Sequence, residues 1–173
     1  MSLWDYVEQG GAIIYVLLIL NLFGLTIILW RGFSLYQFRK NMNDYIAQFV
    51  EHFKSQKLQR DHAGLVILKD KLSDDMKDLE VGLNTVKIIA TISPLLGLLG
   101  TVWGILTAFH VISQEGLDNP ALFAGGISTA LITTVGGLIV AIIHYIAYHY
   151  LSGIIDATET HLEKDIVPQV FNS

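Results

Sequence analysis

The chain has 173 residues and a formal net charge of −5, which argues against nucleic acid as a main partner because phosphate binding needs a concentrated basic face. It contains no cysteine, which excludes disulfides, thiolate metal sites and cysteine nucleophiles. Because 52% of the residues are hydrophobic and only 16% are charged, against about 25% charged residues in soluble domains, the composition predicts an integral membrane protein.

The first apolar segment, AIIYVLLILNLFGLTIILW, covers residues 12–30 and is long enough to cross a bilayer, which takes about 20 residues. Asp5 and Glu8 precede it without any Lys or Arg, whereas a secretory leader opens with basic residues. We therefore expect a retained membrane span behind a short N-terminal stretch of residues 1–11. The span is typical of a lipid-facing helix apart from Asn21, Gly24 and Thr26.

Residues 31–87 hold ten of the eleven Lys and Arg residues. Within them, residues 45–53 and 62–83 carry apolar side chains at helical spacing among charges, which predicts amphipathic helices in a bundle. The expected apolar faces are Ile46, Phe49, Val50 and Phe53 in the first helix, and Leu65, Leu68, Leu72, Met76 and Leu79 in the second.

Two more apolar segments, residues 88–112 and 122–149, are also long enough to cross a bilayer. The connector between them, residues 113–121, contains no basic residue. The predicted fold is therefore an all-α integral membrane protein in which three transmembrane helices are extended by a helical bundle.

The distribution of basic residues predicts the orientation. Apart from the ten within residues 31–87, the remaining basic residue, Lys164, lies in the C-terminal tail, residues 150–173, which we expect to be an amphipathic helix. Basic segments stay on the cytoplasmic side of a membrane. The bundle and the C-terminus are therefore expected in the cytoplasm, and the N-terminus and the connector in the periplasm.

The second and third spans carry small and hydroxyl-bearing residues at steps of three or four, which places them on one face of each helix. Gly100 and Gly104 form a GxxxG pair, which lets helix backbones approach closely. Pro and Gly weaken helices and are tolerated in membranes where neighbouring structure compensates. The predicted helix-packing positions are Pro94, Gly97, Gly100, Gly104, Gly126 and Gly137.

Several hydroxyl groups lie on the same faces. Thr101 follows Ile88 by 13 residues and Thr134 follows Leu122 by 12, so both fall near the middle of their spans. Such hydroxyls either bond only to a carbonyl three or four residues back, or line a path for an ion or for a partner's charged group. Both interpretations stay open for the candidate lining residues Ser93, Thr101, Thr129, Thr133 and Thr134.

Neither span supplies a carboxylate, since Asp and Glu are absent from residues 81–113 and 120–155. A proton carrier inside a membrane normally needs a titratable group. If the chain moves protons, the carboxylate must therefore come from another chain. His144 is a candidate relay because imidazole titrates near neutrality, and anchoring at the membrane interface is the alternative.

At these residues the chain resembles the MotA/TolQ/ExbB proton-channel family, in its ExbB/TolQ branch. ISPLLGLLGTVWGI is similar to that branch's motif in the second span, and GGISTALITTVGGLIVAI is similar to its third-span motif. The resemblance implies a homopentamer around a dimeric single-span partner, ExbD-like or TolR-like, whose helix carries an Asp. It also implies that Thr101 and Thr134 line the path of proton exchange.

The function implied by this resemblance is a motor in the bacterial inner membrane that uses proton-motive force to energise outer-membrane transport, with a TonB-like protein as a further partner. The alternatives are a TolQ-type envelope subunit, a sodium-coupled stator-like unit and a passive scaffold. Thr129 stands where the branch usually has Glu, which keeps sodium open because hydroxyls and carbonyls are hard ligands. No enzyme motif is present, and we expect no cofactor or metal. Membrane lipids are expected as partners.

Overall fold

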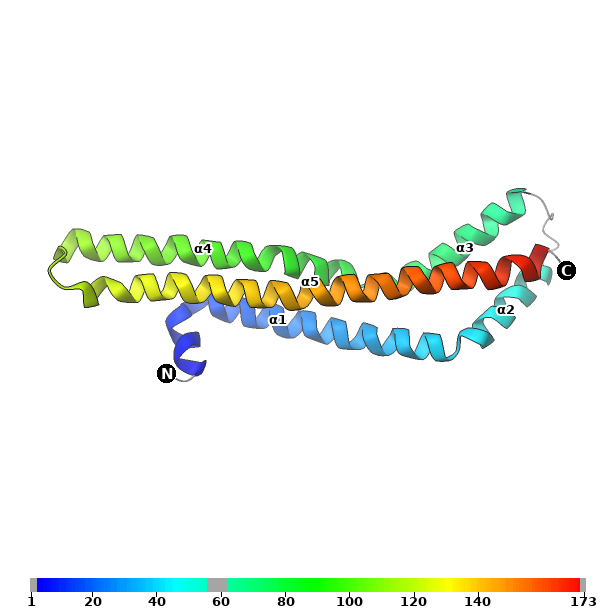
Figure 1. Cartoon of the computed structure of the whole chain (residues 1–173), viewed down its shortest axis with the longest axis horizontal. Coiled ribbons are helices and arrows are strands. Elements are labelled where there is room, and N and C mark those ends of the chain that lie inside the picture. Colours follow the sequence, from blue (N-terminus) through cyan, green and yellow to red (C-terminus); the bar gives the residue numbers. More distant parts are fainter. Residues whose placement is uncertain (1–2, 56–61, 172–173) are drawn as a thin grey trace. The chain divides into compact units, whose positions relative to one another are not determined.

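The computed structural model describes residues 3–55 and 62–171, and all regular structure in these residues is helical (Figure 1). Three of the helices are long and apolar enough to cross a membrane, which confirms the predicted all-α membrane fold. The helices are α1 (Leu3–Lys40), α2 (Met42–Ser55), α3 (His62–Glu80), α4 (Leu83–Glu115) and α5 (Pro120–Phe171), of which α1, α4 and α5 are the long apolar ones.

The chain divides into two compact units. The membrane unit contains the chain up to Thr26 together with Thr85–Ala147, and therefore most of the three apolar segments. The bundle unit contains Ile27–Asn84 and the chain from Tyr148 onward, and therefore α2, α3 and the C-terminal part of α5.

A break at Gly11 divides α1 into a short N-terminal piece and the long apolar helix. The backbone of Gly11 has φ of 61° and ψ of −153°, a conformation that is essentially restricted to glycine. Figure 1 shows the N-terminal piece turned away from the rest of α1. Carbonyl groups just before such a break lose the amide partners that a continuous helix would give them.

The membrane unit has a small core of large side chains, formed by Ile14, Leu17, Ile89 and Val140. The first span therefore does not consist only of lipid-facing residues, because Ile14 and Leu17 are buried against the other helices. The large side chains on the other faces of α4 and α5 are exposed, as expected for surfaces that face lipid; examples are Leu98, Leu99, Trp103, Leu131 and Ile139.

The bundle unit has a larger core, and its predicted apolar faces are confirmed. All four residues expected on the buried face of α2 are buried. On α3 the expected residues are buried except Leu65, which is half-buried. The tail helix adds Ile155, Leu162 and Ile166, which are fully enclosed.

Arg31 is an internal residue of the bundle unit, although it belongs to the basic group that predicts orientation. Its side chain is 7% exposed, and its Nε donates a hydrogen bond to the carbonyl of Val81. Val81 lies in the turn between α3 and α4, where Gly82 has a positive φ of 90°. The guanidinium group therefore holds this turn against α1. It also supplies a hydrogen-bond donor to the carbonyl of Val81, which lies outside both α3 and α4.

Candidate functional site

The helix α4 lies beside the N-terminal part of α5 (Figure 1), and the small residues of the two helices face each other along this contact. A Cβ atom added to Gly104 would lie 2.5 Å from the carbonyl oxygen of Gly126, and one added to Gly126 would lie 2.6 Å from that of Gly104. At the other end, a Cβ atom on Gly137 would lie 2.5 Å from the carbonyl oxygen of Ser93. These contacts are made by backbone atoms, so a larger residue would force the helices apart.

The structure thus brings together five of the six predicted packing residues. Gly97 faces the backbone of Thr133 and Thr134, and Gly100 faces the side chain of Thr133. Pro94 lies inside α4, where it is half-buried. The glycine face of α4 is therefore covered by α5 of the same chain.

Thr101 and Thr134 meet in the middle of this interface. Their hydroxyl oxygens are hydrogen-bonded to each other across the two helices. The hydroxyl of Thr101 also lies 3.2 Å from the carbonyl oxygen of Gly97 and 3.3 Å from that of Ala130. The hydroxyl of Thr134 lies 3.4 Å and 3.2 Å from the same two oxygens. Four oxygen atoms, here called the oxygen cluster, therefore gather where both threonines are half-buried.

The chemistry of the oxygen cluster follows from counting donors and acceptors. Each hydroxyl supplies one O–H donor and two acceptor lone pairs, and each carbonyl supplies acceptors only. The two carbonyls also accept amide protons within their own helices, and the carbonyl of Ala130 lies 3.0 Å from the hydroxyl of Thr133. Together with the two hydroxyl protons of Thr101 and Thr134, these donors are still fewer than the lone pairs of the four oxygens, so the cluster can accept a further hydrogen bond. Such a group can bind a protonated carboxyl group or a hard cation.

Ser93 and Thr133 are placed differently. The hydroxyl of Ser93 donates to the carbonyl of Ile89 at 2.7 Å, and that of Thr133 lies 3.0 Å from the carbonyls of both Thr129 and Ala130. Both side chains are fully buried within the chain. They bond to their own helices, and we expect them to support the wall of the site from behind.

Thr129 connects α5 to the N-terminal piece of α1. Its hydroxyl donates to the carbonyl of Gln9 at 2.8 Å and lies 3.1 Å from that of Gly125. Ser128 adds a hydrogen bond of 3.2 Å to the side chain of Gln9. Gln9 stands just before the break at Gly11, so the Thr129 hydroxyl takes the place of a missing helical amide. The roles of Gln9 and Gly11 were not predicted, although a Gly-Gly pair is a recognised sign of a helix break.

His144 is enclosed by protein. Its ring is fully buried, its Nδ1 bonds to the carbonyl of Val140 at 2.8 Å, and its Nε2 has no hydrogen-bond partner among the described residues. A Cβ atom on Gly24 of α1 would collide with this ring, so Gly24 provides the space that it occupies. His144 follows Thr134 by ten residues, roughly 15 Å along the helix, and the structure does not join it to the oxygen cluster. Its role as a relay stays a prediction.

Comparison with known proteins identifies the family. The profile described as the MotA/TolQ/ExbB proton channel family matches residues 38–164, which include the oxygen cluster. The chain belongs to this family.

Several relatives carry names of the predicted branch. The biopolymer transport protein ExbB of Neisseria gonorrhoeae is 35% identical over 88 residues, which cover 51% of this chain and 40% of the relative. The biopolymer transport protein exbB1 of Vibrio cholerae serotype O1 is 34% identical over 123 residues, covering 70% of this chain and 52% of the relative. The Tol-Pal system protein TolQ of Haemophilus influenzae is 38% identical over 88 residues, covering 51% and 39%.

The predicted ExbB/TolQ branch is therefore confirmed. The chain matches about half or less of the length of these curated relatives. Relatives named ExbB and relatives named TolQ are similar to this chain at comparable identity. The comparison therefore assigns the chain to the joint ExbB/TolQ branch and does not separate ExbB from TolQ.

Proposed function

We propose that this chain is the ring-forming subunit of a proton-driven motor of the ExbB type in the bacterial inner membrane. Five copies surround the single membrane helices of a dimeric ExbD-like partner, and an Asp on the partner exchanges protons beside Thr101 and Thr134. The motor energises outer-membrane transport through a TonB-like protein. The family of the chain and the names of its relatives support this proposal.

The oxygen cluster is the observation that carries the proposal. It is uncharged, half-buried and rich in acceptors, and the spans that form it contain no carboxylate. A protonated Asp on another helix could donate a hydrogen bond to it, whereas an ionised Asp would find no cation there. The protonation state of a borrowed carboxylate would therefore decide how firmly the partner helix is held.

The energies involved are of similar size. An ionised carboxylate at the centre of a membrane helix costs about 2.5–3.5 kcal/mol on insertion scales. One proton that crosses 100 mV releases about 2.3 kcal/mol. Protonation and release of the partner's Asp can therefore be coupled to a mechanical step.

The orientation in this proposal follows the basic residues, with the bundle unit and the C-terminus in the cytoplasm and the N-terminus in the periplasm. Arg39, Lys40 and Lys164 are exposed, as this orientation requires. Cysteine residues introduced at exposed positions such as Gln114 and Lys164 would report it through labelling by an impermeant maleimide from one side of sealed vesicles.

Threonine-to-valine variants test the proposal, because Val keeps the shape of Thr and removes the hydroxyl. We expect Thr134→Val and Thr101→Val to lower proton uptake at least tenfold in proteoliposomes that also contain a single-span partner with a membrane Asp. Thr107→Val is the matched control, since Thr107 lies on the same helix as Thr101, is exposed and, among the described residues, bonds only to the carbonyl of Trp103 at 3.0 Å. Uptake is measured with a pH-sensitive dye under an imposed membrane potential, and oligomer mass is measured in parallel.

A passive scaffold is the second candidate, and one observation favours it. The glycine contacts between α4 and α5 are already satisfied within one chain, and the hydroxyls of Ser93 and Thr133 bond only to their own helix. Native uptake by both valine variants at unchanged oligomer mass would contradict the motor and leave the scaffold. Uptake that requires sodium in place of protons would instead favour the stator-like alternative.

A further inference from the structure

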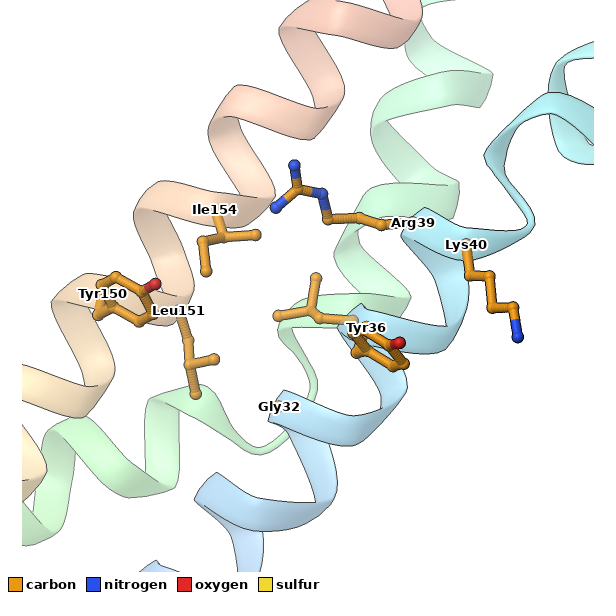
Figure 2. A pocket seen from close by; sticks show the side chains of 8 residues that line it. Gly32, Tyr36, Arg39, Lys40, Tyr150, Leu151 and Ile154 are labelled. Atoms are coloured by element: carbon orange, nitrogen blue, oxygen red, sulfur yellow. The ribbon is translucent and has the colours of Figure 1, made fainter.

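The bundle unit contains a groove between the C-terminal part of α1 and the neighbouring part of α5 (Figure 2). It has a volume of about 560 Å³, and Tyr36 and Arg39 of α1 line it together with Tyr150 and Ile154 of α5. A second cavity of about 510 Å³ shares Arg39, Tyr150 and Ile154 with it. The two cavities thus form one surface groove along α1 and α5, separate from the oxygen cluster.

The groove is basic. Arg39 and Lys40 of α1 and His149 and His161 of α5 line it, and no Asp or Glu is among the described residues that do so. Figure 2 shows the guanidinium group of Arg39 extending toward Ile154 on α5, while Lys40 is directed away. His161 has a carboxylate beside it, since Nδ1 of its ring lies 3.5 Å from Asp165.

Arg39 lacks the carboxylate partner that three lysines of this unit have. Lys69, Lys71 and Lys77 each form an ion pair with a carboxylate, at 3.0, 2.8 and 2.9 Å. Among the described residues no carboxylate pairs with Arg39. A guanidinium group that extends over a groove and has no carboxylate partner there is suited to bind an anion from outside the chain.

The groove lies where the apolar surface of the long helices ends. After Glu8, the first exposed charged residue of α1 is Arg39, because Arg31 is buried. On α5 the first charged residue is Asp156. Several exposed residues before these charges are aromatic, as is common at a membrane–water interface: Trp30, Phe33 and Tyr36 on α1, and Tyr145 and Tyr150 on α5.

We propose that this groove binds the headgroup of an anionic phospholipid, with the phosphate paired to Arg39 and the first acyl carbons against Tyr36, Tyr150 and Ile154. A free phosphate ion offers the same anion, but it would leave the apolar side of the groove uncovered. The level of the groove, at the edge of the apolar surface, also matches a headgroup. The inference does not depend on the proposed motor.

Native mass spectrometry of the full chain in a non-ionic detergent tests this proposal. We expect dioleoyl phosphatidylglycerol to remain bound in preference to dioleoyl phosphatidylethanolamine, which has no net charge. Arg39→Gln should lower the retention of phosphatidylglycerol about fivefold, the size of effect expected for one basic residue near a membrane surface. Lys164→Gln is the control, because it removes the same charge from an exposed position of α5 outside the groove.

A steric variant tests the location independently of charge. Gly32 lines the groove, and a Cβ atom added there would meet nothing within 4 Å, so Gly32→Leu should be tolerated and should obstruct the groove. Gly125→Leu is its control, since Gly125 is equally open and lies elsewhere. We expect Gly32→Leu to reduce retention of phosphatidylglycerol, and Gly125→Leu to leave it unchanged.

The remaining outcomes would overturn the proposal. Equal retention of the two lipids, or unchanged retention in both Arg39→Gln and Gly32→Leu, would exclude an anionic headgroup site. If inorganic phosphate at millimolar concentration displaced phosphatidylglycerol and bound with the same affinity as the lipid, the groove would be assigned to a free anion. A lower oligomer mass in Arg39→Gln without any lipid preference would assign it to an acidic residue of a second copy.

Discussion

The two units of this chain hold their helices together in opposite ways. In the membrane unit, α4 and α5 touch through glycine and hydroxyl residues, and most of their leucine and isoleucine side chains are exposed, with Ile89 as an exception. In the bundle unit, large apolar side chains point inward, and Leu68, Leu72 and Ile155 are fully buried.

The difference reflects the surrounding solvent. Lipid tails are as apolar as leucine, so burying leucine between membrane helices gains little, and close backbone contact is the remaining source of attraction. Water makes burial of the same side chain favourable by about 1.5–3 kcal/mol. In one unit the shape of the backbone therefore determines stability, and in the other the amount of buried apolar area does.

The largest effect that tests this contrast is expected at Gly126. Gly126→Leu would place a side chain against the backbone of Gly104 and Ala108, and we expect the membrane unit not to assemble. Gly125→Leu changes the adjacent residue, where a Cβ atom meets nothing within 4 Å, and it should assemble normally. The yield of monodisperse protein after detergent extraction measures both. Equal yields would show that backbone contact between α4 and α5 is dispensable.

The next effect concerns burial in the bundle unit. Leu68→Ala should lower the free energy of unfolding by about 2–5 kcal/mol, the usual range for a buried leucine. Ile67→Ala removes a similar side chain from the adjacent position, which is 51% exposed, and should cost much less. Denaturant titration followed by circular dichroism gives both values. A similar cost for the two variants would mean that α3 is not held by its apolar face.

Most of this contrast could be predicted from the sequence. Helical spacing of large apolar residues identified the buried faces of α2 and α3, because burial in water leaves a periodic pattern. The steps of three and four between small residues identified the facing sides of α4 and α5, and the residue count placed Thr101 and Thr134 near the middle of their spans. The hydrogen bond between the two hydroxyls was not predicted. What covers the glycine face of α4, namely α5 of the same chain, depends on how the helices pair, and spacing along one helix does not encode that.

Three contacts of the described residues, two in the membrane unit and one in the bundle unit, could not be predicted for a related reason. Gln9 accepts a hydrogen bond from Thr129 only because Gly11 breaks α1, and Gly24 is needed only because His144 lies opposite it. Arg31 counts as a basic loop residue in sequence, yet it is buried by its bond to the turn at Val81. Each is a contact between residues distant in sequence, and the sequence around either residue of the pair does not indicate that the contact forms.

A smaller effect, with opposite signs in the two units, is expected for glycines of α1. Gly24→Ala should lower stability by about 1–3 kcal/mol, because the ring of His144 would have to leave its bond to Val140. Gly32→Ala should raise stability by about 0.5–1 kcal/mol, since its Cβ atom meets nothing and alanine favours helix. Unfolding in mixed micelles measures both. A gain in both variants would mean that the ring of His144 moves aside without cost.

The smallest effect concerns a polar contact of the bundle unit and its dependence on pH. The hydroxyl of Tyr45 donates to a carboxylate oxygen of Asp75 at 2.7 Å, and Asp75 also pairs with Lys71 at 2.8 Å. Burial of the phenol, followed by its hydrogen bond to Asp75 and the charge of Asp75, raises the pKa of Tyr45 above the ordinary value of 10.0. Tyr45→Phe should cost about 1 kcal/mol at neutral pH, because Asp75 keeps Lys71 as a partner.

The pH dependence of that cost has a definite sign. The folded state holds the phenol proton more tightly than the unfolded state, so this contribution is complete below pH 10 and declines as the pH rises above 10. Above pH 10 the native chain should therefore lose stability more steeply than Tyr45→Phe, and the two curves should converge. Tyr36→Phe, which changes an exposed phenol of the same unit, controls for general alkaline effects such as loss of the lysine charges. Parallel curves for the native chain and Tyr45→Phe would show that the proton of Tyr45 is not held by the fold, which would leave apolar burial as the main force in the bundle unit.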